Sequence, residues 1–297
     1  MRQYLVTMLI ALVASVATFK VMAPTATSTA ATPTAARESS YERIMRTGTI
    51  RCGYFIWEPF MYKDAQTNQL MGINYEMMER IGDILGFKIE WTTQADIGTY
   101  SQDLASGKYD VVCASVWPNA ARINNSLLTD AEVWSVAYAF VRTDDTRLDG
   151  DLRKANSPEI TMAVFDGDYT QDIAKQTFPQ AKTFSMAANA SGGDMLVALA
   201  NGKVDFVVAD MGIYHQFNKS NPGKLRPVAN VAPVRVFGEY LAVPLGEHQL
   251  KNMLDMAIQV LNGNRVFENI LKKYEANGYV LSSFAVTDPF TLHRRME

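Results

Sequence analysis

The chain has 297 residues, which is enough for two domains of ordinary size. Its hydrophobic fraction of 48% and aromatic fraction of 10% are those of a globular protein. Residues 38–297 carry 25 basic and 31 acidic residues, a formal net charge of −6, which argues against nucleic acid as a partner. Three histidines and two cysteines are too few and too scattered for a zinc site, so we expect no metal and no cofactor.

The N-terminal segment does not have the composition of a folded domain. Residues 1–22 contain Arg2 and a 16-residue apolar run from Tyr4 to Phe19, the form of a signal peptide or a short membrane anchor. Residues 23–40 form an Ala/Thr/Pro-rich linker that is too poor in large apolar side chains to fold. Cleavage and anchoring both remain open. In either case we expect the body of the protein in the periplasm or at the extracytoplasmic face of the membrane.

The next hundred residues alternate between strand and helix patterns. Apolar periodicity and turn residues predict helices at residues 40–46, 73–85 and 100–105 and strands at 49–54, 87–91 and 109–116. An aromatic loop, residues 55–62, follows the first strand, and Gly72 opens the second helix. The order β-α-β-α-β is typical of a mostly parallel sheet.

A nine-residue motif occurs twice, 95 residues apart. Residues 104–112 read LASGKYDVV and residues 199–207 read LANGKVDFV. Each copy predicts a helix end, a Gly with positive φ, and an apolar strand, so the chain contains two similar α/β lobes. Ligands bind outside the carboxyl ends of strands in such sheets, which makes Ser115 and Asp210 candidate ligand contacts. We expect Asp110 and Asp205 to brace the turns of the repeat.

The second lobe is predicted between two crossing segments. Strands at residues 136–141 and 238–243 enclose a strand at 160–164, helices at 171–176 and 194–199, and a strand at 204–209. Helices at 249–261 and 266–274 return to the first lobe. We therefore predict an α/β fold with lobe 1 at residues 41–141 and 240–297, lobe 2 at 142–239, and a ligand cleft between them.

Cys52 and Cys113 each lie in a predicted strand of the first lobe. A disulfide is conceivable in an oxidising compartment. Directly paired strands usually hold cysteines in poor bridging geometry, and we therefore favour two buried thiols over a disulfide.

The order of these motifs resembles a known family. The chain has an aromatic loop ending in Pro59-Phe60, Gly72 before a long helix, the first repeat, and Ser115 followed seven residues later by Arg122. The second repeat is followed by Asp210. Residues 41–280 thus resemble periplasmic solute-binding proteins of the polar amino acid ABC transporter type, the bacterial extracellular solute-binding protein family 3. The resemblance implies the fold of type II periplasmic binding proteins.

The resemblance also implies a zwitterion site. Arg122 corresponds to the family Arg that clamps the ligand's α-carboxylate, Asp210 to the Asp that accepts the α-ammonium, and Ser115 to the Ser at the strand end. Arg suits a carboxylate because its planar fork donates two parallel hydrogen bonds, and Asp suits an ammonium because it only accepts.

Five further residues complete the expected site. Thr170 or Tyr169 is the nearest match to a family Thr, although the family's Gly-Thr pair reads Gly167-Asp168 here, which we interpret as loop chemistry. Trp57 and Phe60 are expected to pack on the ligand's side chain. Trp117 departs from the small hydroxyl residue of the family, and a Trp at the wall would remove volume and a hydrogen-bond donor.

These features predict a non-enzymatic, monomeric binding protein that captures an amino acid by lobe closure and delivers it to an ABC transporter permease. One alternative is an enzyme on the same scaffold, similar to cyclohexadienyl dehydratases, which need an acid to expel a hydroxyl group; Glu58 is the candidate acid. Another is a ligand-sensing module for a receptor, favoured if the N-terminal run remains as an anchor. Fold alone does not separate these functions.

Overall fold

The computed structural model describes residues 38–187, 190–279, 281 and 284–285. The predicted signal or anchor and most of the linker lie outside the described residues. Within the described part of the chain, no helix combines the length and apolarity needed to cross a membrane.

The first half of the fold follows the predicted alternation closely. Its elements are α2 (Ser40–Thr47), β1 (Thr49–Tyr54), β2 (Tyr62–Lys63), β3 (Leu70–Met71), α3 (Ile73–Leu85), β4 (Lys88–Gln94), α4 (Tyr100–Ser106), β5 (Val111–Val116), α5 (Ala120–Asn125) and β6 (Ser126–Leu128). The strand predicted at residues 49–54 and the helix at 73–85 have the observed bounds.

The second half begins and ends with long strands. Its elements are β7 (Val133–Arg142), a 3₁₀ turn (Leu152–Ala155), β8 (Thr161–Phe165), α6 (Tyr169–Thr177), β9 (Lys182–Met186), α7 (Gly192–Ala200), β10 (Val207–Asp210), α8 (Met211–Ser220), β11 (Leu225–Pro227), β12 (Arg235–Pro244), α9 (His248–Gly263), α10 (Val266–Ala276) and β13 (Phe284–Ala285). Both crossing strands, β7 and β12, extend beyond their predicted bounds.

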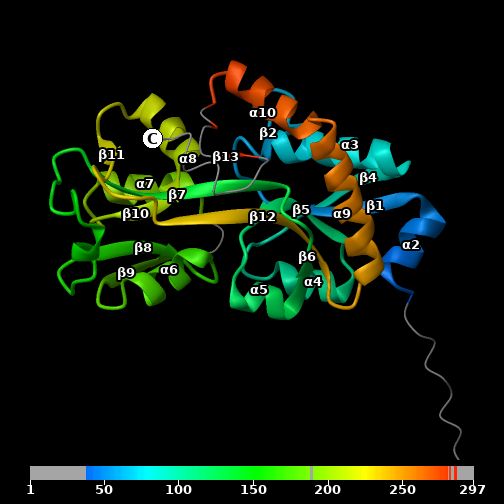
Figure 1. Ribbon diagram of the computed structural model, residues 1–297, viewed down its shortest axis with the longest axis horizontal. Helices are drawn as coiled ribbons and strands as arrows, with labels where there is room; N and C mark the ends of the chain where they lie inside the picture. The colour runs from blue at the N-terminus through cyan, green and yellow to red at the C-terminus, as the bar shows by residue number, and fades with distance from the viewer. Residues whose placement is uncertain (1–37, 188–189, 280, 282–283, 286–297) are drawn as a thin grey trace, which may run out of the picture. The chain divides into compact units, whose positions relative to one another are not determined.

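The main sheet has the order β10-β7-β12-β5-β1-β4, which confirms the α/β class. It is a mixed sheet, because β1 pairs in parallel with β4 and β5, whereas β12 pairs antiparallel with β5 and β7. A second, parallel pair joins β8 and β9. In Figure 1, β7 and β12 run side by side from the group of elements around β8 and β9 to the group around β1 and β5.

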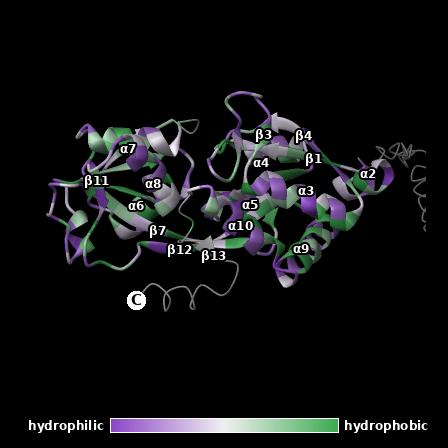
Figure 2. Cartoon of the chain, turned by 90° about the horizontal axis from the view of Figure 1, so that it is seen from above, coloured by the Kyte–Doolittle hydropathy of each residue, from purple (hydrophilic) through white to green (hydrophobic). Residues whose placement is uncertain are grey.

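Buried apolar residues gather in clusters on the two sides of these crossing strands. The largest cluster takes its buried residues from 44–133 and 241–281, and another takes them from 137–237. Helix α9 carries hydrophilic and hydrophobic residues in turn along its length (Figure 2), the pattern of a helix that buries one face. The boundaries at residues 141/142 and 239/240 stay a prediction.

Both copies of the repeat form the predicted unit. Gly107 and Gly202 have φ of 74° and 71°, and a strand follows each. Asp110 accepts a hydrogen bond from the backbone N–H of Arg51 at 2.8 Å, and Asp205 accepts one from Thr161 at 2.8 Å. Each Asp thus ties the end of the repeat to the first strand of its half of the fold. This confirms that these residues brace the repeat.

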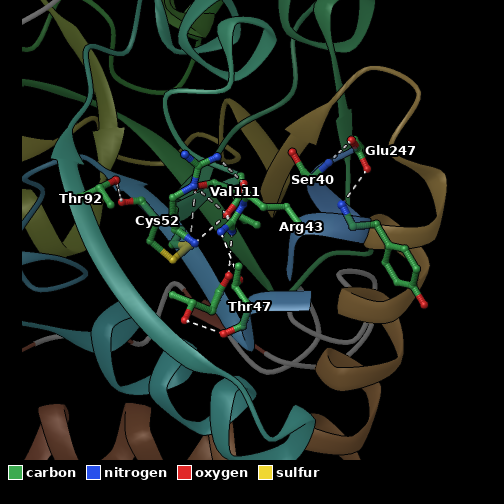
Figure 3. A network of polar contacts seen from close by, with 12 residues as sticks. Ser40, Arg43, Thr47, Cys52, Thr92, Val111 and Glu247 are labelled. Carbon is green, nitrogen blue, oxygen red and sulfur yellow. Dashed lines mark hydrogen bonds and ion pairs between the residues drawn. A yellow bond between two sulfur atoms is a disulfide. The ribbon is translucent and has the colours of Figure 1, made fainter. Parts of the chain in front are cut away.

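Arginine side chains complete the first of these braces. Asp110 is fully buried and pairs with Arg43 and Arg51. Figure 3 shows Arg43 reaching from α2 into this network, which also includes its hydrogen bond to the backbone oxygen of Thr49 at 2.7 Å.

Replacement of Asp110 by Asn should lower the free energy of unfolding by about 3 kcal/mol, because it leaves Arg43 and Arg51 without their buried carboxylate. Asp103→Asn is the matched control: its pair with Lys108 is at 3.1 Å but much more exposed, and we expect a loss of about 1 kcal/mol or less. Urea unfolding of both variants measures the difference, and equal losses would contradict the bracing role.

The cysteines depart from the prediction. Cys52 and Cys113 form a disulfide, so the expectation of two buried thiols is wrong. In β1 and β5 Cys52 is level with Val111, two residues before Cys113. The cysteines are therefore diagonal neighbours on one face of the sheet rather than a directly opposed pair. Their Cα atoms are 5.4 Å apart, within the usual range for a disulfide.

Candidate functional site

A cavity of about 560 Å³ lies at the strand ends of both halves of the fold. Its wall includes seven of the eight predicted site residues: Trp57, Phe60, Ser115, Trp117, Arg122, Tyr169 and Thr170. It also includes residues that the sequence analysis did not assign to the site, among them Asn74, Asp96, Asp168, Gly192 and Glu239. Asp210, the eighth predicted residue, is not part of the wall.

Arg122 is buried and paired within the protein. It lies in α5, whose N-cap Asn119 accepts a hydrogen bond from the Arg122 backbone. Its Nη2 lies 3.1 Å from Oδ2 of Asp168, and its Nη1 donates to the backbone oxygen of Trp117. Its Nε is buried and has no hydrogen-bond partner. The predicted carboxylate clamp therefore holds an internal carboxylate and keeps one donor in reserve.

Asp168 is positioned by the start of α6. Its side chain accepts hydrogen bonds from the backbone and the hydroxyl of Thr170 at 3.1 and 3.2 Å, which makes it the helix N-cap. The hydroxyl of Thr170 in turn accepts from the N–H of Phe165 at 2.9 Å. Thr170 thus lines the cavity while its hydroxyl holds the loop together, and the acid that faces Arg122 is Asp168.

Asp210 serves a different purpose. It is the N-cap of α8, and its Oδ1 accepts from the N–H of Ile213 at 2.9 Å. Burial raises the pKa of Asp210, and the hydrogen bonds that it accepts oppose this rise. The alternative role weighed for Asp210 in the sequence, a helix cap, is the one that the geometry displays.

Trp117 is part of an aromatic wall and also a hydrogen-bond donor. Its ring stacks on Phe237 with the centroids 4.9 Å apart and meets the edge of Tyr169. Its indole N–H donates to Oε1 of Glu239 at 3.0 Å. The expected loss of a donor at this position is therefore wrong, because the indole supplies one and anchors an acid of the cavity wall.

Two buried glutamates lie together beside this wall. Glu132 and Glu239 are 1% and 3% exposed, and the backbone N–H of Glu132 donates to the carbonyl of Glu239 at 2.9 Å. The Ser115 hydroxyl contacts Glu132 and lies 3.2 Å from Oδ1 of Asn74. Burial raises the pKa of Glu132 to about 8 and that of Glu239 to about 7, and each negative charge is opposed by its neighbours.

The raised pKa of Glu132 gives a pH dependence of stability. Between about pH 5 and 8 the folded protein holds a proton that the unfolded chain releases, so the free energy of unfolding falls by a few kcal/mol as the pH rises. Glu132→Gln should flatten this slope. The difference between the two proteins isolates Glu132, because His215, whose pKa burial lowers, titrates in both. Parallel slopes in urea titrations at pH 5, 6, 7 and 8 would contradict this assignment.

Comparison with known proteins agrees with this architecture. Residues 50–277 match the family model of the bacterial extracellular solute-binding proteins, family 3. The chain belongs to this family. The expected type II periplasmic-binding-protein fold is also confirmed by solved structures of family members.

Two of these structures illustrate the similarity. An amino acid ABC transporter substrate-binding protein of Streptococcus pneumoniae bound to L-arginine has a TM-score of 0.67 at 19% identity, over 78% of this chain and 96% of that chain. An ancestral amino acid-binding protein described as a precursor of cyclohexadienyl dehydratase has a TM-score of 0.66 at 20% identity, over 79% and 98%. At these identities the likeness shows the fold.

A curated relative joins this module to further sequence. The membrane-bound lytic murein transglycosylase F of Sodalis glossinidius is 25% identical over 212 residues, 70% of this chain. The match spans only 44% of the relative's length.

Proposed function

We propose that this protein is an extracytoplasmic solute-binding protein that captures a small zwitterion, an amino acid, and delivers it to an ABC transporter permease. The observation that carries the proposal is the buried ion pair between Arg122 and Asp168 in the cavity wall. The pair contains both charges that a zwitterion needs. A ligand that enters between them gives its carboxylate to Arg122 and its ammonium to Asp168.

The exchange keeps every buried charge paired. Burying a charge without a partner costs several kcal/mol, and an amino acid replaces one internal pair by two pairs to the ligand. The unpartnered Nε of Arg122 supplies a further donor for the incoming carboxylate. Arg122 and Asp168 belong to the two proposed lobes, so a ligand held by both favours closure about β7 and β12.

The proposed location follows from the family and from the N-terminal sequence. We propose that residues 1–22 direct export and that the body acts as a monomer outside the cytoplasm. Fractionation of cells, with the N-terminus of the recovered protein sequenced, separates a cleaved from an anchored form.

The proposal is tested by a thermal-shift screen of the purified protein against the common amino acids. A ligand at a thousand times its Kd stabilises the folded state by about 4 kcal/mol, which is a shift of several degrees. Deaminated and decarboxylated analogues of the best ligand should each give a much smaller shift. Absence of any shift, or equal shifts from the analogues, would overturn the zwitterion site.

An enzymatic role is the second candidate, and the pKa of Glu239 favours it. A carboxyl with a pKa of about 7 in a cavity wall has the protonation state of a general acid. Glu58, the acid expected from the sequence, does not line the cavity and accepts from the hydroxyl of Tyr279 at 2.6 Å. Formation of an aromatic product from cyclohexadienyl acids, followed by ultraviolet absorbance and lost in Glu239→Gln, would establish this role.

A further inference from the structure

Four buried polar residues form a cluster at the cavity: Asn74, Ser115, Glu132 and Glu239. Asn74, Ser115 and Glu239 line the cavity, and Glu132 contacts the Ser115 hydroxyl from behind. This acidic cluster is separate from the Arg122–Asp168 pair.

The acidic cluster contains negative charge that the protein does not balance. Among the described residues Glu132 and Glu239 take part in no ion pair, and Arg122 is the only basic side chain in the cavity wall. Arg122 is already paired with Asp168. Carboxylates buried in this way ordinarily have a cationic partner.

A second observation points to a ligand. The side-chain nitrogen of Asn74, a residue only 1% exposed, is buried in the cavity wall without a hydrogen-bond partner, and so is Oε2 of Glu132 behind it. Buried polar atoms without partners are rare in native proteins. The described residues contain no group of three or more His, Cys, Asp or Glu placed to hold a metal ion, which favours an organic partner.

The hydrogen-bond chemistry of Ser115 defines what that partner donates. The hydroxyl contacts both Glu132 and Asn74 but has a single proton. Donation to the Glu132 carboxylate leaves the hydroxyl oxygen to accept from the Asn74 amide nitrogen. A half-turn of the Asn74 amide then places its oxygen at the unpartnered position. The cluster therefore presents acceptors, the Asn74 oxygen and the Glu239 carboxylate, to the cavity.

We propose that the acidic cluster is a second ligand subsite that receives a cationic group of the solute. An ammonium has three donors and no acceptor, which matches a site of acceptors beside a carboxylate. The inference rests on the proposed function for the other end of the ligand, where the Arg122–Asp168 pair takes the zwitterion. The solute is then an amino acid with a cationic side chain, and it carries a net positive charge.

The test compares L-lysine with L-norleucine, which has a methyl group in place of the side-chain ammonium, by titration calorimetry at pH 8. We expect lysine to bind about 30-fold or more tightly, the effect of one buried charge contact. Glu239→Gln should reduce this preference to nearly nothing, because Gln still accepts from the Trp117 indole but carries no charge. Glu79→Gln is the matched control, since Glu79 accepts from the Trp91 indole at 3.0 Å outside the cavity, and the preference should persist.

The outcomes separate the two proposals. Equal binding of lysine and norleucine, or a preference that survives Glu239→Gln, overturns the subsite and leaves the zwitterion site standing. Binding of 1,5-diaminopentane alone, lost in Glu239→Gln, supports the subsite and overturns the zwitterion site. Failure of all three probes to bind overturns both.

Discussion

Removal of the Cys52–Cys113 disulfide is expected to lower the free energy of unfolding by about 4 kcal/mol. The bridge spans 61 residues of sequence, and closing a loop of this length restricts the unfolded chain by about that amount. Both cysteines are fully buried in the core cluster, so reductant should act only on unfolded molecules.

Urea unfolding with and without reductant measures this effect. The midpoint should fall with reductant, and the dependence on urea should steepen because the unfolded chain becomes more expanded. The double variant Cys52→Ala/Cys113→Ala should start from the lower stability and not respond to reductant. A midpoint that is the same in both conditions would show that the cysteines are reduced in the native protein. A stabilising disulfide also fits the proposed location in an oxidising compartment.

Much of the fold could be predicted because local chemistry determines it. Gly72 has φ of 130°, and a Cβ there would lie 2.3 Å from the backbone oxygen of Phe60, so only Gly fits the start of α3. The repeat was equally readable, since each copy encodes its helix end, turn and strand within nine consecutive residues. Such signals do not depend on distant parts of the chain.

The contacts of the site were less accessible because they join residues far apart in sequence. Asp168 was assigned to loop chemistry, and its pairing with Arg122, 46 residues away, depends on how the two halves of the fold approach each other. The substitution of Asp for the family's Thr at this position was the available signal. Glu239 gave another, because a single acid in an otherwise apolar strand requires a polar partner. That partner, Trp117, is 122 residues away.

The largest effect on ligand binding is expected at the Arg122–Asp168 pair. Asp168→Asn keeps a good helix N-cap and removes the charge. An amino acid should then lose about 2–4 kcal/mol of binding free energy, because its ammonium is buried without an anion. The deaminated analogue should bind more tightly than to the wild type, because Arg122 no longer has to leave a carboxylate. Arg122→Ala should show the mirror image, with the amino acid weakened and the decarboxylated amine strengthened.

Asp210→Asn is the matched control for this prediction. Asp210 is also a buried N-cap, and it occupies the position that the family resemblance assigns to the ammonium. If Asp168 is the negative pole, Asp210→Asn should bind the amino acid within about threefold of the wild type, since it alters no residue of the cavity wall. Titration calorimetry of the three variants with the amino acid and both analogues distinguishes the two acids. Loss of binding in Asp210→Asn with wild-type affinity in Asp168→Asn would return the ammonium site to Asp210, because the charge that the ligand requires would then be the one that caps α8.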